Sequence, residues 1–272
     1  MNQNITKAIL PLAALSCVHG KMLAQDAARP NILYIMCDDH AMQAISAYGS
    51  PISKLAPTPN IDRLAQRGML FRNCFVENSL STPSRACLMT GLYSHQNGQR
   101  QLAEGIDTTK TFVPELMQKA GYETGIVGKW HMMCRPKGFD YYYILDGQGK
   151  YYNPNFCTTG NYGKYKQEMG YATTLTTQHA IEFLDHRQKD KPFCLYVHHK
   201  APHRSWFAEP KHIGMYDGVD FPLPKTFWDN YENRGSAAKT QKMNIEKDME
   251  LILDFKIPEL LDTSDVESMA SY

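Results

Sequence analysis

The 272-residue chain has little net charge, no long apolar run and few cysteines, and each absence excludes a class of protein. Lys and Arg number 29 against 28 Asp and Glu, whereas a dedicated nucleic-acid binder usually carries a basic excess. No apolar stretch reaches the roughly 20 residues that cross a bilayer as a helix. Seven cysteines without a CxxC pair argue against a disulfide scaffold and a zinc site. We therefore expect a globular protein with neither a nucleic-acid partner nor a membrane span.

The first residues predict a targeting segment. Lys7 precedes a short apolar run, residues 8–18, and a polar stretch follows at residues 25–29. This order is typical of a secretory signal peptide, which we place at residues 1–24. Gly20 and Ala24 both offer a small residue for cleavage, so the cleavage point stays open. A buried N-terminal helix is the alternative interpretation.

Short apolar runs alternate with stretches of helical periodicity along the rest of the chain. Strands are predicted over 31–37, 70–76, 122–127 and 192–198, and helices over 59–68, 112–120 and 172–187. This alternation predicts an α/β fold with a mostly parallel, mixed sheet flanked by helices. The Tyr-rich and Gly-rich stretch 141–165 is predicted to be a surface insertion that helps to build a pocket wall.

Polar clusters lie where ligands bind in such sheets, beyond the carboxyl ends of strands. Asp38 and Asp39 follow the first strand, and adjacent carboxylates either hold Ca²⁺ or Mg²⁺ or cap the next loop. Ser81 or Thr82 begins a helix, where an anion or an ordinary cap is expected. Arg85, one helical turn later, can reach back to an oxyanion or to the side chain at position 81.

Two further clusters add cations and histidines. Lys129 and His131 follow the strand at 122–127 and share one side of an extended segment. Residues 198–203, which follow the last predicted strand, contain three histidines and a lysine. A pair such as Lys129 and His131 is more often a surface lysine and a hydrogen-bonded histidine, and one of the three histidines is expected to point into a site while the others are solvated. Together, the clusters supply the groups needed to cleave a negatively charged ester.

Four motifs occur in order along the chain. They are R-P-N-I-L with a later D-D over 29–39, T-P-N-I-D-x-L-A over 58–65, S-T-P-S-R with a later T-G pair over 81–91, and G-Y-x-T with G-K-W-H over 121–131. Through these motifs the chain resembles the formylglycine-dependent sulfatases of the alkaline phosphatase superfamily. The resemblance covers residues 29–203 and implies a sulfuric ester hydrolase with an alkaline phosphatase-like sheet.

The resemblance also implies a nucleophile and a metal. Ser81 matches the position that is oxidised to formylglycine, and a serine there resembles the bacterial type matured by a radical enzyme. The aldehyde hydrate has two hydroxyls, of which one attacks sulfur and the other collapses to release sulfate. Asp38, Asp39 and the residue at position 81 would bind Ca²⁺, with Mg²⁺ as the alternative ion.

Further roles are implied for four basic residues. Arg85 would stabilise the ionised hydrate, and His131 would deprotonate its hydroxyl. Lys129 and His203 would bind the sulfate, and His203 would also be placed to protonate the leaving alcohol. A signal peptide on a protein of this type implies export to the bacterial periplasm, the cell surface or the medium.

Sulfatases of this family carry further motifs that are not recognised in this sequence. An S-D-N/H-G strand end, a further lysine and a smaller C-terminal sheet domain belong to the family pattern, and none is recognised after residue 203. We therefore expect residues 29–272 to be the N-terminal portion of a sulfatase catalytic domain, incomplete at the C-terminus and without the small domain.

The overall motif pattern favours a sulfated carbohydrate as the substrate. It is most similar to sulfatases that act on 6-O-sulfated N-acetylglucosamine of glycosaminoglycans or mucins. One alternative is a phosphonate or phosphate monoester hydrolase of the same superfamily. Another is an inactive, truncated chain that only binds sulfated glycans.

Overall fold

The computed structural model describes residues 29–250 and Asp254 of the chain. The chain divides into two units, Met1–Pro30 and Asn31–Tyr272, and the described helices and strands all lie in the second. The signal peptide predicted over residues 1–24 lies outside the described residues. Within 29–250, no helix has the length and apolar character needed to span a membrane.

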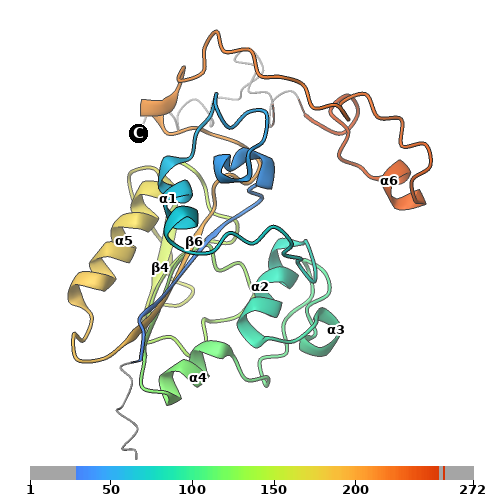
Figure 1. The fold of residues 1–272 in the computed structure, drawn as a ribbon. Helices are drawn as coiled ribbons and strands as arrows, with labels where there is room; N and C mark the ends of the chain where they lie inside the picture. Colours follow the sequence, from blue (N-terminus) through green and yellow to red (C-terminus); the bar gives the residue numbers. More distant parts are fainter. Residues whose placement is uncertain (1–28, 251–253, 255–272) are drawn as a thin grey trace, which may run out of the picture. The chain divides into compact units, whose positions relative to one another are not determined.

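A six-stranded mixed sheet forms the centre of this unit, in the order β1-β6-β2-β3-β4-β5 (Figure 1). The first four strands of this order are parallel, and β4 and β5 continue the sheet antiparallel. The bounds are β1 (Ile32–Cys37), β6 (Phe193–His199), β2 (Glu123–Gly128), β3 (Tyr141–Leu145), β4 (Asn155–Thr158) and β5 (Lys166–Gln167). The predicted α/β fold with a mostly parallel, mixed sheet is confirmed.

Helices cover both faces of the sheet (Figure 1). They are α1 (Pro59–Arg67), α2 (Ser81–Thr90), α3 (Ser94–Asn97), α4 (Val113–Lys119), α5 (Ala172–His186) and α6 (Ser236–Thr240), with short 3-10 turns at Met42–Ala44, Ser46–Tyr48 and Pro210–His212. Side chains alternate between the faces along β2. Ile126 packs in the cluster that contains Met89 of α2, whereas Val127 packs with Phe183 of α5. The predicted helices at 59–68, 112–120 and 172–187 are confirmed.

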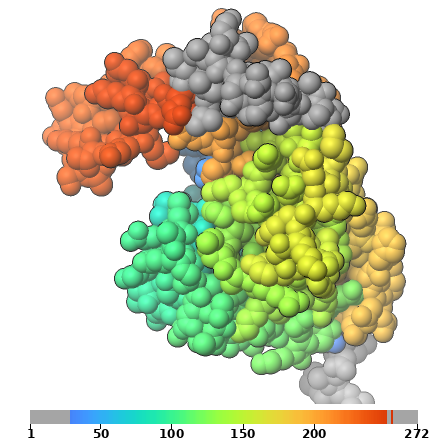
Figure 2. All heavy atoms as spheres, turned by 180° about the vertical axis from the view of Figure 1, so that it is seen from behind, coloured from blue at the N-terminus to red at the C-terminus, as the bar shows by residue number. Residues whose placement is uncertain are grey.

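Two local predictions are wrong. Residues 70–76 form no strand, and Phe75 there is 89% exposed. An apolar run becomes a strand only when a sheet edge pairs with it, and none of the described strands pairs with 70–76. The stretch 141–165 is not a surface insertion, because it contains β3 and β4 and buries Tyr142, Ile144 and Phe156. In Figure 2 the yellow-green residues of this stretch lie against the neighbouring green and yellow residues on this face.

Candidate active site

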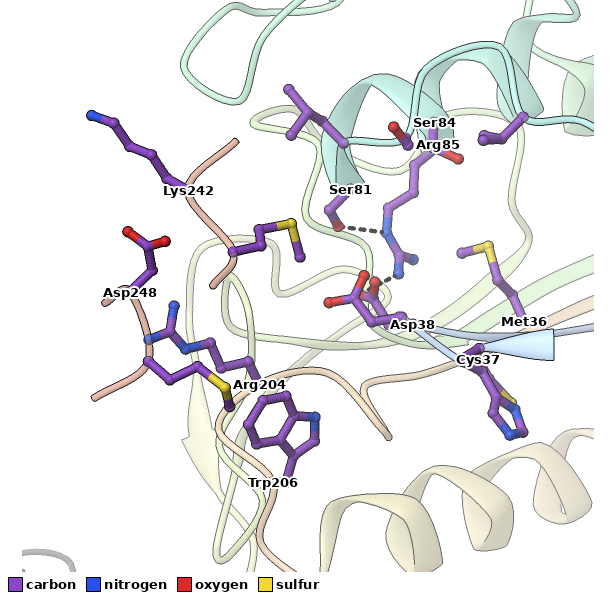
Figure 3. Close-up of a pocket in the computed structure, with 18 residues that line it drawn as sticks. Met36, Cys37, Asp38, Ser81, Ser84, Arg85, Arg204, Trp206, Lys242 and Asp248 are labelled. Atoms are coloured by element: carbon purple, nitrogen blue, oxygen red, sulfur yellow. Dashed lines mark hydrogen bonds and ion pairs between the residues drawn. The ribbon is translucent and has the colours of Figure 1, made fainter. Parts of the chain in front are cut away.

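The carboxyl ends of β1, β6 and β2 lie side by side. The parallel register pairs Cys37 with His199, and His198 with Gly128. The polar residues that follow these strands therefore meet at one edge of the sheet. Ser81, the first residue of α2, lies at this edge and lines a cavity of about 720 Å³. Asp38, Asp39, Ser81 and Arg85 line this cavity. Figure 3 shows Asp38, Ser81 and Arg85 close together.

Arg85 links the predicted site residues to one another. Its side chain is 2% exposed and lies one turn inside α2. Nη2 donates to Oδ2 of Asp38 at 3.1 Å, and Nε donates to Oγ of Ser81 at 3.3 Å. Nη1 donates to the carbonyl oxygen of Lys129 at 2.6 Å. The guanidinium thus reaches back to position 81, as its spacing in the sequence predicts. It also connects the start of α2 to the residues that follow β1 and β2.

Asp38 faces two buried cations. Nζ of Lys129, whose side chain is fully buried, donates to the same Asp38 oxygen that Arg85 contacts. Burial opposes the ionisation of Asp38, but the hydrogen bond and charge of Lys129 and the charge of Arg85 outweigh it and lower the pKa of Asp38. Burial lowers the pKa of Lys129 to about 8, against the attraction of Asp38. One carboxylate therefore pairs with two cations, and the three ionised side chains together carry one net positive charge.

His131 lies beside the first residue of α2. Its Nδ1 is 3.4 Å from Oγ of Ser81 and 3.4 Å from Oγ1 of Thr82. Burial, together with the charges of Lys129 and Arg85, lowers the pKa of His131 to about 4. The imidazole is therefore neutral near pH 7, and its nitrogen can accept a proton from a hydroxyl at position 81.

Asp38, Asp39 and His203 form a group that could hold a cation. One potential ligand atom from each lies within 4.8 Å of the others. Nε2 of His203 is 3.7 Å from Oδ2 of Asp39, whose side chain is 60% exposed. Carboxylate oxygens are the ligands that Ca²⁺ and Mg²⁺ prefer, and an imidazole suits these ions less well. The donor set therefore fits a hard divalent cation held by the two aspartates.

The sequence alone does not single out His198, although it belongs to the histidine run that begins at the end of β6. It is 1% exposed, and its Nδ1 lies 3.1 Å from Nη1 of Arg85. Burial and the charge of Arg85 hold the pKa of His198 well below its usual range. A neutral imidazole at this place can accept a hydrogen bond from the guanidinium, so His198 helps to fix the orientation of the Arg85 side chain. Only its position at a strand end could have indicated this role.

Comparisons with known proteins agree on one family. A family model described as "Sulfatase" matches residues 30–251. The chain is 44% identical over 263 residues to an N-acetylglucosamine-6-O-sulfatase of Bacteroides thetaiotaomicron, covering 94% of this chain and 46% of that protein. It is 31% identical over 263 residues to a human N-acetylgalactosamine-6-sulfatase, covering 84% of this chain and 47% of that protein.

A solved structure is also similar over most of the described fold. It holds its substrate, D-glucosamine-2-N,6-O-disulfate, and gives a TM-score of 0.81 at 44% identity. The similarity covers 90% of this chain and 48% of the solved chain. The chain thus spans about half the length of the curated relatives it matches.

Proposed function

Because the chain belongs to the sulfatase family, we propose that it hydrolyses sulfate esters of sugars. We propose 6-O-sulfated N-acetylglucosamine, within a glycosaminoglycan or mucin, as the substrate. The name of the 44% identical relative and the 6-O-sulfated glucosamine in the similar structure support this choice. Both favour a sulfate ester over the phosphate or phosphonate ester of the alternative hydrolases. A secretory signal at residues 1–24 would place the enzyme in the bacterial periplasm, on the cell surface or in the medium.

The observation that carries the proposal is the position of Ser81. It begins α2, receives a hydrogen bond from Arg85 and lies beside the neutral His131. We propose that a serine-type radical maturase oxidises Ser81 to formylglycine. The hydrated aldehyde would supply one hydroxyl to attack sulfur and a second to expel the sulfate.

The surrounding side chains have separate roles in this proposal. Asp38, Asp39 and the group at position 81 would hold Ca²⁺ or Mg²⁺, which adds positive charge next to the sulfate. His131 would accept the proton of the attacking hydroxyl at its Nδ1. Arg85 would stabilise the oxygen that loses this proton.

The sulfate and the leaving alcohol are assigned to two other residues. Lys129 would bind a sulfate oxygen with its ammonium group. As the bond between sulfur and the sugar oxygen breaks, His203 would give a proton to that oxygen, so that the sugar leaves as a neutral alcohol. The side chain of His203 is 22% exposed, so it can exchange protons with solvent.

The test is to express the chain together with a serine-type radical maturase and to analyse the peptide that contains Ser81. Conversion to formylglycine removes two hydrogen atoms, so the peptide mass should fall by about 2 Da. Sulfate release from N-acetylglucosamine 6-sulfate should accompany the conversion and be absent in Ser81→Ala. An unchanged peptide mass would remove the proposed nucleophile. Conversion without sulfate release would refute this substrate and leave the two alternatives, a phosphate or phosphonate ester hydrolase and a chain that only binds sulfated glycans.

A further inference from the structure

The wall of the cavity opposite Ser81 carries apolar as well as charged residues. Trp206 lines it and is 45% exposed, Met243 and Met249 line it as well, and Arg204, Lys242 and Asp248 lie on the same side. In Figure 3, Trp206 lies on the opposite side of Asp38 from Ser81. No catalytic or binding role proposed above uses this wall. Its composition therefore requires a separate explanation.

The segment that carries Trp206 is fastened to the sheet region by a tyrosine clamp. The clamp consists of three phenol hydroxyls that donate to backbone carbonyls on both sides of Trp206: Tyr151 to residue 203 at 2.6 Å, Tyr171 to residue 207 at 2.8 Å, and Tyr152 to residue 208. The three rings are buried and pack around Phe207. The backbone at Trp206 is therefore held in place while its indole stays exposed to the cavity.

The cavity thus offers both charged and apolar surface. Arg85 and Asp38 lie on one side, with Lys129 hydrogen-bonded to Asp38. The indole of Trp206 lies on the other side, where Arg204, Lys242 and Asp248 also lie, and two thioethers add apolar surface. An inorganic anion would use only the charged side chains. A ligand that uses both kinds of surface has an anionic group at one end and a ring with C–H faces at the other. A sugar sulfate has this character, and the volume of about 720 Å³ lies within the usual range for a small-molecule site.

We propose that Trp206 is the platform on which the sugar ring packs while its sulfate ester reaches Ser81. The inference rests on the proposed sulfatase function and adds to it the residue that recognises the sugar. The flat indole offers a large apolar face to the C–H groups of a pyranose ring. Because the clamp fixes the backbone on both sides, little ordering of this segment is needed when the ring binds.

The experiment compares two ligands and three variants by isothermal titration calorimetry. The ligands are N-acetylglucosamine 6-sulfate and inorganic sulfate, added with Ca²⁺ to the full chain with Ser81 unconverted, so that nothing is hydrolysed. Trp206→Ala should bind the sugar sulfate roughly tenfold more weakly and inorganic sulfate unchanged. Trp206→Phe keeps an aromatic face and should recover most of the loss. Trp228→Ala is the control, because Trp228 is 84% exposed and does not line the cavity.

Three results would overturn the platform. If wild type binds both ligands and Trp206→Ala binds the sugar sulfate equally well, the platform is wrong and the sulfatase proposal stands. If Trp206→Ala or Trp206→Phe loses affinity for inorganic sulfate too, the side chain maintains the whole cavity and does not select the sugar. If wild type binds neither ligand, the proposed function fails, and the platform fails with it.

Discussion

Asp38→Asn should destabilise the metal-free protein far more than Asp39→Asn. The carboxylate of Asp38 is 9% exposed and forms ion pairs with the side chains of Arg85 and Lys129, which are 2% and 0% exposed. The side chain of Asp39 is 60% exposed, and the ion pair that the described residues give it is with His203 at 3.7 Å. The two variants thus remove the same group from adjacent residues in opposite environments.

The expected sizes follow from burial. Removing one partner of a buried ion pair costs about 3–5 kcal/mol, because the remaining charge is left without compensation. An exposed pair contributes about 0–1 kcal/mol. For a unit of this size each kcal/mol moves the melting temperature by about 2–4 °C. Asp38→Asn should therefore melt roughly 6–20 °C below wild type, and Asp39→Asn at most about 4 °C below.

The assay is thermal unfolding followed by near-ultraviolet circular dichroism, first with EDTA and then with Ca²⁺. In EDTA only Asp38→Asn should be strongly destabilised. With Ca²⁺, wild type should gain stability from binding the ion, and both variants should lose most of that gain because each lacks one carboxylate. Equal melting temperatures of the two variants in EDTA would refute the idea that Asp38 carries the charge balance of the folded site.

Three other predictions concern the site and its supports. Gly128→Ala would place a Cβ 2.1 Å from a backbone oxygen of β6 at φ 95°, so its melting temperature should fall well below that of Gly160→Ala, where φ is 83° and no atom lies within 4 Å; equal melting temperatures would contradict the close approach of the strands. His131→Ala should lower kcat roughly 100-fold or more with little change in KM, in assays of converted enzyme, because a proton acceptor acts in the transition state; a normal kcat would exclude that role. Tyr171→Phe keeps the ring but loses the bond to the carbonyl of residue 207, so calorimetry should show weaker binding of the sugar sulfate and unchanged binding of inorganic sulfate; unchanged binding of both would separate the clamp from sugar recognition.

The parts of the fold that the sequence predicts well are those in which local pattern and tertiary environment agree. The apolar runs at 31–37, 122–127 and 192–198 are buried or paired strands because each has a parallel neighbour. The run at 70–76 has the same local pattern, but no strand among residues 29–250 pairs with it, and composition cannot indicate this. In 141–165 the tyrosines resemble surface residues, yet Tyr151 and Tyr152 are 5% exposed because each hydroxyl finds a buried backbone acceptor.

The site shows the same division. The positions of these residues at strand ends and along a helix were enough to predict that Asp38, Ser81, Arg85 and Lys129 lie close together. They could not show that both cations use one oxygen of Asp38, because that depends on how far β1, β2 and β6 extend beside one another. The pairing of His198 with Gly128 across β6 and β2, which puts an imidazole behind the guanidinium, is likewise a matter of strand register.

The shared carboxylate also predicts that cation and anion bind cooperatively. Without a bound cation, Asp38 forms ion pairs with Arg85 and Lys129. A sulfate ion must therefore compete with the Asp38 carboxylate for these two basic side chains. A divalent cation on Asp38 and Asp39 would take over this carboxylate and leave the two basic side chains for the anion. Each ion should therefore strengthen the binding of the other by the same factor, and couplings of this kind typically amount to about 5–150-fold.

Calorimetric titration with inorganic sulfate, with and without Ca²⁺, measures this coupling. Wild type should bind sulfate more tightly when Ca²⁺ is present. Asp38→Asn removes the competing charge, so its sulfate affinity should be higher than that of wild type without Ca²⁺ and nearly insensitive to the ion. Asp39→Asn keeps the competing carboxylate and should bind sulfate as wild type does when Ca²⁺ is absent. A wild-type affinity for sulfate that does not respond to Ca²⁺ would mean that Arg85 and Lys129 are held by Asp38 in every state, and neither could then serve the sulfate ester.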